Sequence, residues 1–160
     1  MKTNIYRMGD ELKEVVKNLK AGNKKIVFTN GVFDIIHRGH IEYLNEAKKH
    51  GDILIVGLNS DSSVKKIKGD KRPLVKEYDR AIVLVDLKPV DFVVIFEEEN
   101  PYNLIKFILP DVLVKGGDWK PEEIIGSDIV KEHGGKVLSL TYVDNYSTTG
   151  IIQKISETKK

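Results

Sequence analysis

The sequence of 160 residues contains no cysteine and no long hydrophobic run. Without cysteine the chain can form neither a disulfide framework nor a thiolate zinc site. Its longest apolar runs, such as residues 92–96, have the length of a strand and fall short of the roughly 20 residues that a membrane-spanning helix needs. The first residues, Met1-Lys2-Thr3-Asn4, lack the apolar stretch of a signal peptide. We therefore expect a cytoplasmic protein.

An excess of charge of one sign is missing as well, because 26 basic and 24 acidic side chains leave a net charge of +2. A generic nucleic-acid binder usually carries a large basic excess, so this class is disfavoured. Basic side chains nevertheless gather between residues 65 and 72. Such a run is often only a solvated face. Gly69 and Pro73 favour the alternative, a loop that closes over phosphate.

Apolar runs alternate with amphipathic segments along the chain, and this alternation predicts one α/β domain. The expected strands are residues 25–30, 52–59, 90–96, 112–114 and 136–140. The expected helices are residues 10–20, 41–49, 64–68, 76–88, 100–109, 121–134 and a last one after Ser147. Strands that alternate with helices predict a five-stranded parallel sheet with helices on both faces and a helical extension before residue 24. In such sheets ligands bind at the carboxyl ends of the strands.

Residues 29–40 join an expected strand to an expected helix through a short glycine-containing loop. The N-terminus of a helix presents unpaired N–H groups and the positive end of its dipole, so it can bind phosphate. His37 and His40 are three residues apart and face one side of the first helical turn, where both can donate hydrogen bonds to phosphate oxygens. Gly39 lets a flat base approach the backbone. Two alternatives are unrelated surface histidines and a metal site, which would need a third ligand.

The run from Asn30 to His40 resembles the signature of the cytidylyltransferase-like nucleotidyltransferase superfamily, whose members have a Rossmann-like fold. Further similar stretches lie at the expected strand ends: residues 59–61, 68–73, 115–118, 121–124 and 147–149. Within the superfamily the chain is most similar, over about residues 24–155, to heptose-1-phosphate adenylyltransferases. Those enzymes occur alone or as the C-terminal half of a bifunctional heptose kinase/adenylyltransferase.

The resemblance implies transfer of AMP from ATP to heptose 1-phosphate, giving ADP-heptose for lipopolysaccharide and pyrophosphate. Magnesium would enter with ATP, with no metal ligand from the protein. The implied partners are these small molecules, neither nucleic acid nor membrane, and a second copy of the chain in a homodimer. Residues 142–145 lack the arginine of glycerol-3-phosphate cytidylyltransferases, so CTP and glycerol 3-phosphate are the runner-up substrates. A nucleotide-binding module without turnover is the other alternative.

The resemblance also implies the site residues. Those acting on the transferring phosphate are His37, His40, Lys68 and Arg72. Those binding the nucleotide are Asn30, Gly31, Val32, Phe33, Gly39, His40, Lys115, Gly117, Asp118, Ser147, Thr148 and Thr149. Those binding the sugar phosphate are Asp34, Asn59, Asp61, Lys71 and Arg80. For Arg80 the alternative is a salt bridge on the helix surface, and for residues 147–149 it is an N-cap alone.

Overall fold

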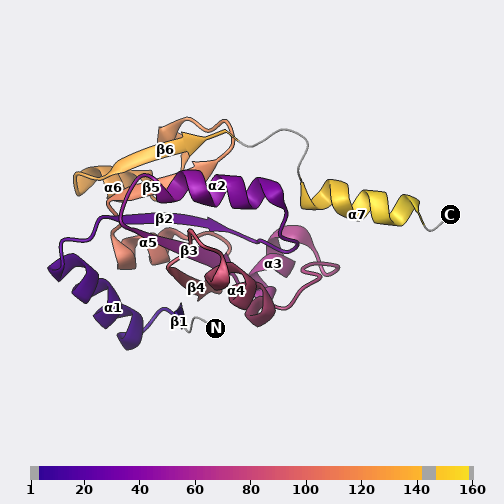
Figure 1. The fold of residues 1–160 in the computed structure, drawn as a ribbon, viewed down its shortest axis with the longest axis horizontal. Helices are drawn as coiled ribbons and strands as arrows, with labels where there is room; N and C mark the ends of the chain where they lie inside the picture. Colours follow the sequence, from indigo (N-terminus) through magenta and orange to yellow (C-terminus); the bar gives the residue numbers. More distant parts are fainter. Residues whose placement is uncertain (1–3, 142–146, 159–160) are drawn as a thin grey trace.

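A parallel sheet organises the chain in the computed structural model, which describes residues 4–141 and 147–158 (Figure 1). Its six strands lie in the order β1-β4-β3-β2-β5-β6. They are β1 (Ile5–Arg7), β2 (Ile26–Gly31), β3 (Ile53–Asn59), β4 (Phe92–Phe96), β5 (Val112–Gly116) and β6 (Lys136–Leu140). The five expected strands are confirmed, and the expectation of only five is wrong. The additional strand, β1, has three residues, which is too short for its hydrophobic pattern to stand out.

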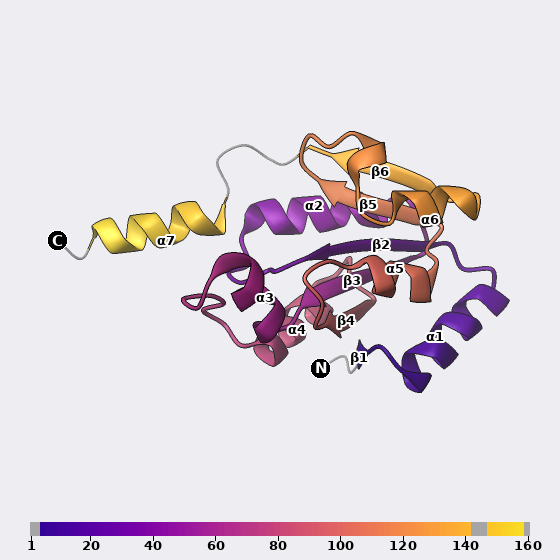
Figure 2. The ribbon, with the colours of Figure 1, turned by 180° about the vertical axis from the view of Figure 1, so that it is seen from behind.

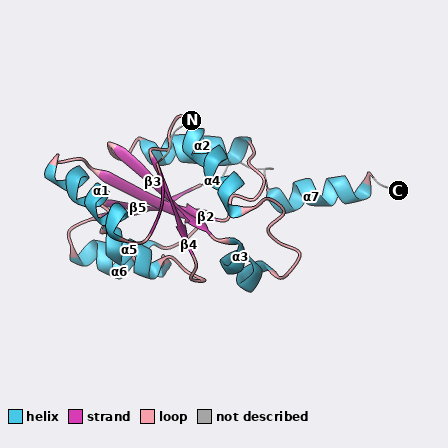
Figure 3. Cartoon of the chain, turned by 90° about the horizontal axis from the view of Figure 1, so that it is seen from below, coloured by secondary structure: helices cyan, strands magenta, loops and turns pink. Residues whose placement is uncertain are grey.

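Helices connect the strands and cover both faces of the sheet, as the sequence predicts (Figure 3). They are α1 (Asp10–Ala21), α2 (Arg38–Lys48), α3 (Asp61–Lys68), α4 (Glu77–Asp86), α5 (Tyr102–Ile108), α6 (Ser127–Glu132) and α7 (Thr148–Glu157), with a 3-10 turn, η1 (Pro121–Glu123). The expected helix over residues 121–134 is therefore divided. Gly126 has a φ of 86°, which breaks the helix between η1 and α6. None of the described helices is long and apolar enough to cross a membrane.

Two layers of apolar side chains fill the space between the sheet and its helices. One layer joins α2 and α4 to the sheet through residues such as Val27, Leu44 and Leu84. The other joins α1, α5 and α6 to the opposite face. Leu12 of α1 is completely buried in this second layer. The segment before residue 24 is thus part of the core, and β1 pairs with β4 along its whole length.

The central strand, β2, pairs with β3 on one side and β5 on the other. The chain leaves β2 in one direction to build β3 and β4 and later returns to add β5 and β6, so the strand order reverses there. In open parallel sheets this switch point forms a crevice at the carboxyl ends of the strands. The loop after β2, residues 32–37, starts at this crevice. Helix α7 projects beyond the same end of the sheet (Figures 1 and 2).

Candidate functional site

The histidine pair stands at the first turn of α2, directly after the loop that leaves β2. His37 is the N-cap residue of α2, and His40 is the third residue of the helix. Their rings stack with centroids 3.8 Å apart and an angle of 23° between the planes. Phe33, which is buried and has a φ of 45°, packs its ring 5.2 Å from that of His40. The alternative of two unrelated surface histidines is therefore wrong.

Both histidines have lowered pKa values. Burial lowers the pKa of His37, and burial together with the charge of His37 lowers the pKa of His40 to about 4. The two rings are consequently neutral at pH 7, and a neutral imidazole has one N–H donor. The backbone N–H of His37 donates to Nδ1 of His40 at 3.4 Å, so the proton of His40 resides on Nε2. His40 thus presents a fixed donor that points away from the helix backbone.

Hydrogen bonds at the switch point hold α2 in place. The hydroxyl groups of Thr29 on β2 and Tyr43 on α2 lie 2.6 Å apart, and the Tyr43 hydroxyl donates to the carbonyl of Val114 on β5 at 3.4 Å. Helix α2 is in this way tied to both strands that flank the crevice. Nothing in the sequence marks Tyr43 as a positioning residue, because a tyrosine on the apolar side of a helix is ordinary core.

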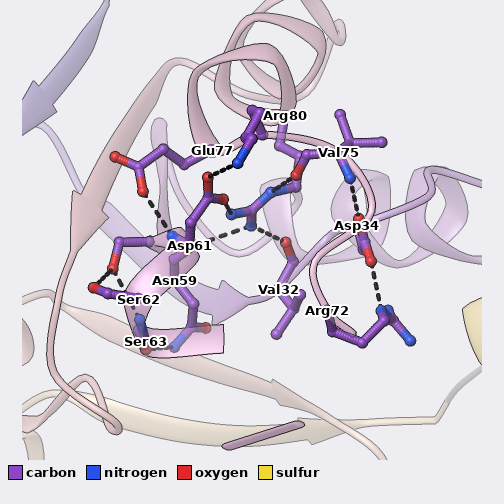
Figure 4. A network of polar contacts seen from close by, with 12 residues as sticks. Val32, Asp34, Asn59, Asp61, Ser62, Ser63, Arg72, Val75, Glu77 and Arg80 are labelled. Carbon is purple, nitrogen blue, oxygen red and sulfur yellow. Dashed lines mark hydrogen bonds and ion pairs between the residues drawn. The ribbon is translucent and has the colours of Figure 1, made fainter. Parts of the chain in front are cut away.

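Asp34 anchors the loop that follows α3 and carries Arg72, the last residue of the basic cluster (Figure 4). Its side chain is fully buried and accepts hydrogen bonds from the backbone N–H groups of Leu74 and Val75, each at 2.9 Å, and from Nε of Arg72 at 2.6 Å. Burial by itself would raise the pKa of Asp34, but these hydrogen bonds outweigh burial and hold the pKa below its ordinary value. The structure therefore joins Asp34, an expected sugar-phosphate ligand, to Arg72, an expected phosphate ligand.

Three other expected sugar-phosphate residues also contact one another (Figure 4). Arg80 is 1% exposed and donates from Nη2 to Asp61 at 2.9 Å. Its Nη1 donates to the carbonyls of Val32 at 2.6 Å and Asn59 at 2.9 Å, and its Nε to that of Val75 at 2.9 Å. Since a guanidinium has five N–H donors, protein atoms already occupy four of them. The surface salt bridge considered for Arg80 is wrong, because Arg80 is buried and pairs across to the start of α3.

The remaining basic residues of the cluster differ in exposure. Lys68 and Lys71 are exposed, whereas the Arg72 side chain is only 17% exposed. The Nε of Arg72 is held by Asp34, and its two terminal nitrogens have no hydrogen-bond partner among the residues that the structure describes. Arg72 can therefore bind an anion while it stays anchored. No group of three or more potential metal ligands occurs within residues 4–141 and 147–158.

A tight turn follows β5 and carries Asp118 to the surface at the carboxyl end of the sheet. Gly117 has a φ of 112°, a conformation that suits glycine. Ser139 of β6 fixes the turn, since its hydroxyl donates to the Gly117 carbonyl and accepts from the Trp119 backbone N–H at 3.1 Å. Sequence reasoning did not single out Ser139, whose position within a strand resembles that of any small half-buried residue.

The N-terminus of α7 reaches the loop after β2. Ser147 caps α7 by accepting a hydrogen bond from the backbone N–H of Gly150 at 3.0 Å. The Thr148 hydroxyl donates to the carbonyl of Ile35 at 3.3 Å, so this helix start lies beside the loop that leads to the histidine pair. Residues 142–145, the expected place of the missing arginine, lie outside the described residues.

The chain is similar to curated proteins over most of its length. The chain is 55% identical to the "Bifunctional protein HldE" of Shigella sonnei over 94% of its own length and 32% of the relative's. It is 53% identical to the protein of the same name from Geobacter metallireducens over 91% of its length and 30% of the relative's. The chain thus spans about a third of these curated relatives.

Two solved structures share the fold. The "lipopolysaccharide core biosynthesis protein" of Thermoplasma volcanium has a TM-score of 0.60 at 29% identity, covering 78% of this chain and 99% of that one. The pantoate-beta-alanine ligase of Francisella tularensis has a TM-score of 0.61 at 16% identity, covering 96% of this chain and 78% of that one, which speaks for the fold alone. A family model described as Cytidylyltransferase-like matches residues 28–154. The chain therefore belongs to the cytidylyltransferase-like family.

Proposed function

We propose that this chain is an adenylyltransferase that transfers AMP from ATP to heptose 1-phosphate and releases pyrophosphate. The observation that carries the proposal is the stacked, neutral histidine pair at the start of α2, with the tautomer of His40 fixed by a hydrogen bond. Preorganised neutral donors at a helix N-terminus suit a phosphoryl group that gathers negative charge during transfer.

The reaction needs positioning and charge stabilisation more than proton transfer. The ionised phosphate of the sugar attacks the α-phosphorus of ATP, a new P–O bond forms, and the bond to pyrophosphate breaks. His37 and His40 donate to the α-phosphate and to the bridging oxygen as it gains charge. The nucleophile is already ionised, so no general base is required. ATP enters as its magnesium complex, and the metal neutralises part of the triphosphate charge.

Further residues surround the same crevice. The terminal nitrogens of Arg72 and the N-terminus of α7, with residues 147–149, bind the β- and γ-phosphates. Lys68 and Lys71 are exposed and would have to close over the ligand to contribute. Gly39 receives the adenine, and Asp118 accepts hydrogen bonds from the ribose hydroxyls. Asn59, Asp61 and Arg80 act mainly on one another, and Asp34 holds Arg72 and the backbone of residues 74 and 75. Both sets of contacts keep this wall of the site in shape.

The choice of heptose rests on the relatives. They are bifunctional proteins, of which this chain corresponds to about a third, and the solved structure at 29% identity is that of a lipopolysaccharide core biosynthesis protein. We propose that the chain works in the cytoplasm, where ATP is available, and that it forms a homodimer.

The test is incubation of the chain with ATP, Mg²⁺ and heptose 1-phosphate while pyrophosphate release is followed. Release that depends on both substrates is expected. CTP with glycerol 3-phosphate is the matched alternative pair. Pyrophosphate release with that pair alone would show that the chain is a glycerol-3-phosphate cytidylyltransferase. Binding of ATP without product for any sugar or alditol phosphate would instead indicate a nucleotide-binding module.

A further inference from the structure

A pocket of about 140 Å³ opens at the carboxyl ends of β2 and β5, next to the histidine site but on the other face of the sheet. Asn30 and Lys115 line it from the two strands. Side chains alternate along a strand, and Phe28 and Leu113, two residues earlier, belong to the apolar layer shared with α1, α5 and α6. The pocket therefore faces away from α2.

The rest of the pocket is apolar with one acidic residue at its edge. Pro101, at the start of α5, and Ile124, after η1, are buried and form its floor, and Glu123 and Trp119 stand at the rim. The indole N–H of Trp119 donates to the carbonyl of Gly116 at 3.2 Å, and the backbone of Trp119 is held by Ser139. The ring is therefore fixed in place, although the residue is 47% exposed.

Lys115 is the unusual member of this pocket. Burial lowers the pKa of its ammonium group, and no described carboxylate lies within ion-pair distance of it. A half-buried ammonium without a partner is costly, and a ligand that supplies acceptor oxygens offsets this cost. Asn30 adds two donors and an acceptor at the neighbouring strand end.

We propose that this pocket binds the sugar ring of the acceptor, with Lys115, Asn30 and Glu123 hydrogen-bonding its hydroxyl groups and Trp119 covering its apolar C–H face. The inference rests on the proposed function and deepens it, because it separates the acceptor subsite from the nucleotide subsite. It also moves Asn30 and Lys115 from nucleotide binding to sugar binding.

The placement of the pocket favours an acceptor over a nucleotide base. In phosphoryl transfer the attacking and leaving oxygens lie roughly in line on opposite sides of the phosphorus. The triphosphate groups that leave are placed on the side of α2 and α7, so the acceptor must arrive from the other side. The pocket opens on that other face of β2. Its volume of about 140 Å³ lies below the roughly 300–1,000 Å³ of pockets that hold drug-sized ligands, so it suits a single ring better than a whole nucleoside.

Trp119 provides the measurement, because it is the only tryptophan of the chain. Heptose 1-phosphate is titrated into the nucleotide-free protein, and Trp119 fluorescence is recorded, with inorganic phosphate and AMP as comparison ligands. A saturable change with heptose 1-phosphate alone is expected. A change with AMP and none with heptose 1-phosphate would assign the pocket to the base and overturn the proposal.

The variant Lys115→Met keeps the length of the side chain and removes its charge. We expect it to raise the KM for heptose 1-phosphate by about tenfold or more, as for a lost hydrogen bond to a charged group, and to change the KM for ATP less than twofold. Lys120→Met, at an exposed lysine of the same loop, is the matched control and should leave both values unchanged.

The two proposals fail in different ways. An equal rise in both KM values for Lys115→Met, with thermal stability unchanged, would overturn the sugar pocket while the adenylyltransferase activity stands. A saturable Trp119 signal without pyrophosphate release from ATP and any sugar phosphate would support the pocket and count against the proposed activity.

Discussion

Replacement of Arg80 by methionine should destabilise the fold strongly. The guanidinium is 1% exposed and makes four hydrogen bonds, one of them to the carboxylate of Asp61. Methionine is similar in length but leaves Asp61 and the carbonyls of Val32, Asn59 and Val75 without their donor. Removing one partner of a buried ion pair costs about 3–5 kcal/mol of unfolding free energy. For a chain of this size that corresponds to a drop of roughly 6–20 °C in Tm.

Urea denaturation followed by circular dichroism measures this loss. In the double variant Arg80→Met/Asp61→Asn the carboxylate is also removed. Its loss of unfolding free energy should therefore be smaller than the sum of the losses in the two single variants by about 0.5–3 kcal/mol. Lys131→Met is the control, since Lys131 pairs with Glu122 at the surface and its loss should cost at most about 1 kcal/mol. The reasoning is refuted if the unfolding free energy of Arg80→Met lies within about 1 kcal/mol of that of the unaltered chain and only the KM for the sugar phosphate rises. Arg80 would then be a ligand of the substrate.

Three further predictions concern the histidine pair and Asp34. His40→Ala should lower kcat by about 10²–10³ with little change in the KM for ATP, as for loss of a donor to the transition state, whereas a rise in KM alone would indicate uniform binding. Because the pKa of His40 is about 4 in the folded state, the unfolded chain binds more protons between pH 4 and 6.5. Stability should therefore fall as the pH is lowered through this window, and His40→Gln should flatten the fall seen in urea titrations; an unchanged pH profile would contradict the assignment. Asp34→Asn should lower the unfolding free energy by about 1–3 kcal/mol and speed tryptic cleavage after Lys71, because the loop of residues 69–75 loses its buried anchor. Equal cleavage rates in the variant and the unaltered chain would show that other contacts hold the loop.

The order of strands and helices was predictable because buried parallel strands are nearly continuous apolar runs. The histidine pair was predictable for a similar reason, since its spacing and the strand before it are local features. Strand β1 was missed because three residues carry no periodicity, and the break at Gly126 was missed because a single glycine within a helical pattern is usually tolerated.

The ion pairs that surround the site could not be predicted, because they join distant parts of the chain. Arg80 and Asp61 are 19 residues apart, and Arg72 and Asp34 are 38 apart. Sequence reasoning placed all four residues near a phosphate but could not show that they satisfy one another. In the same way, the strand ends gave Asn30 and Lys115 a place near the ligand, and only the pleat of β2 and β5 shows which face of the sheet they line.

Strand β1 has a consequence for solubility. The backbone N–H of Val93 donates to the carbonyl of Asn4 at 2.9 Å, and β1 continues this pairing along β4. A chain shortened to residues 24–160 would keep every residue of the proposed site but would leave β4 as an open edge with unpaired backbone groups. Open edges pair readily with other sheets and lead to aggregation. Residues 4–7 therefore protect the fold from self-association, at a distance from the chemistry that the carboxyl ends of β2 and β5 support.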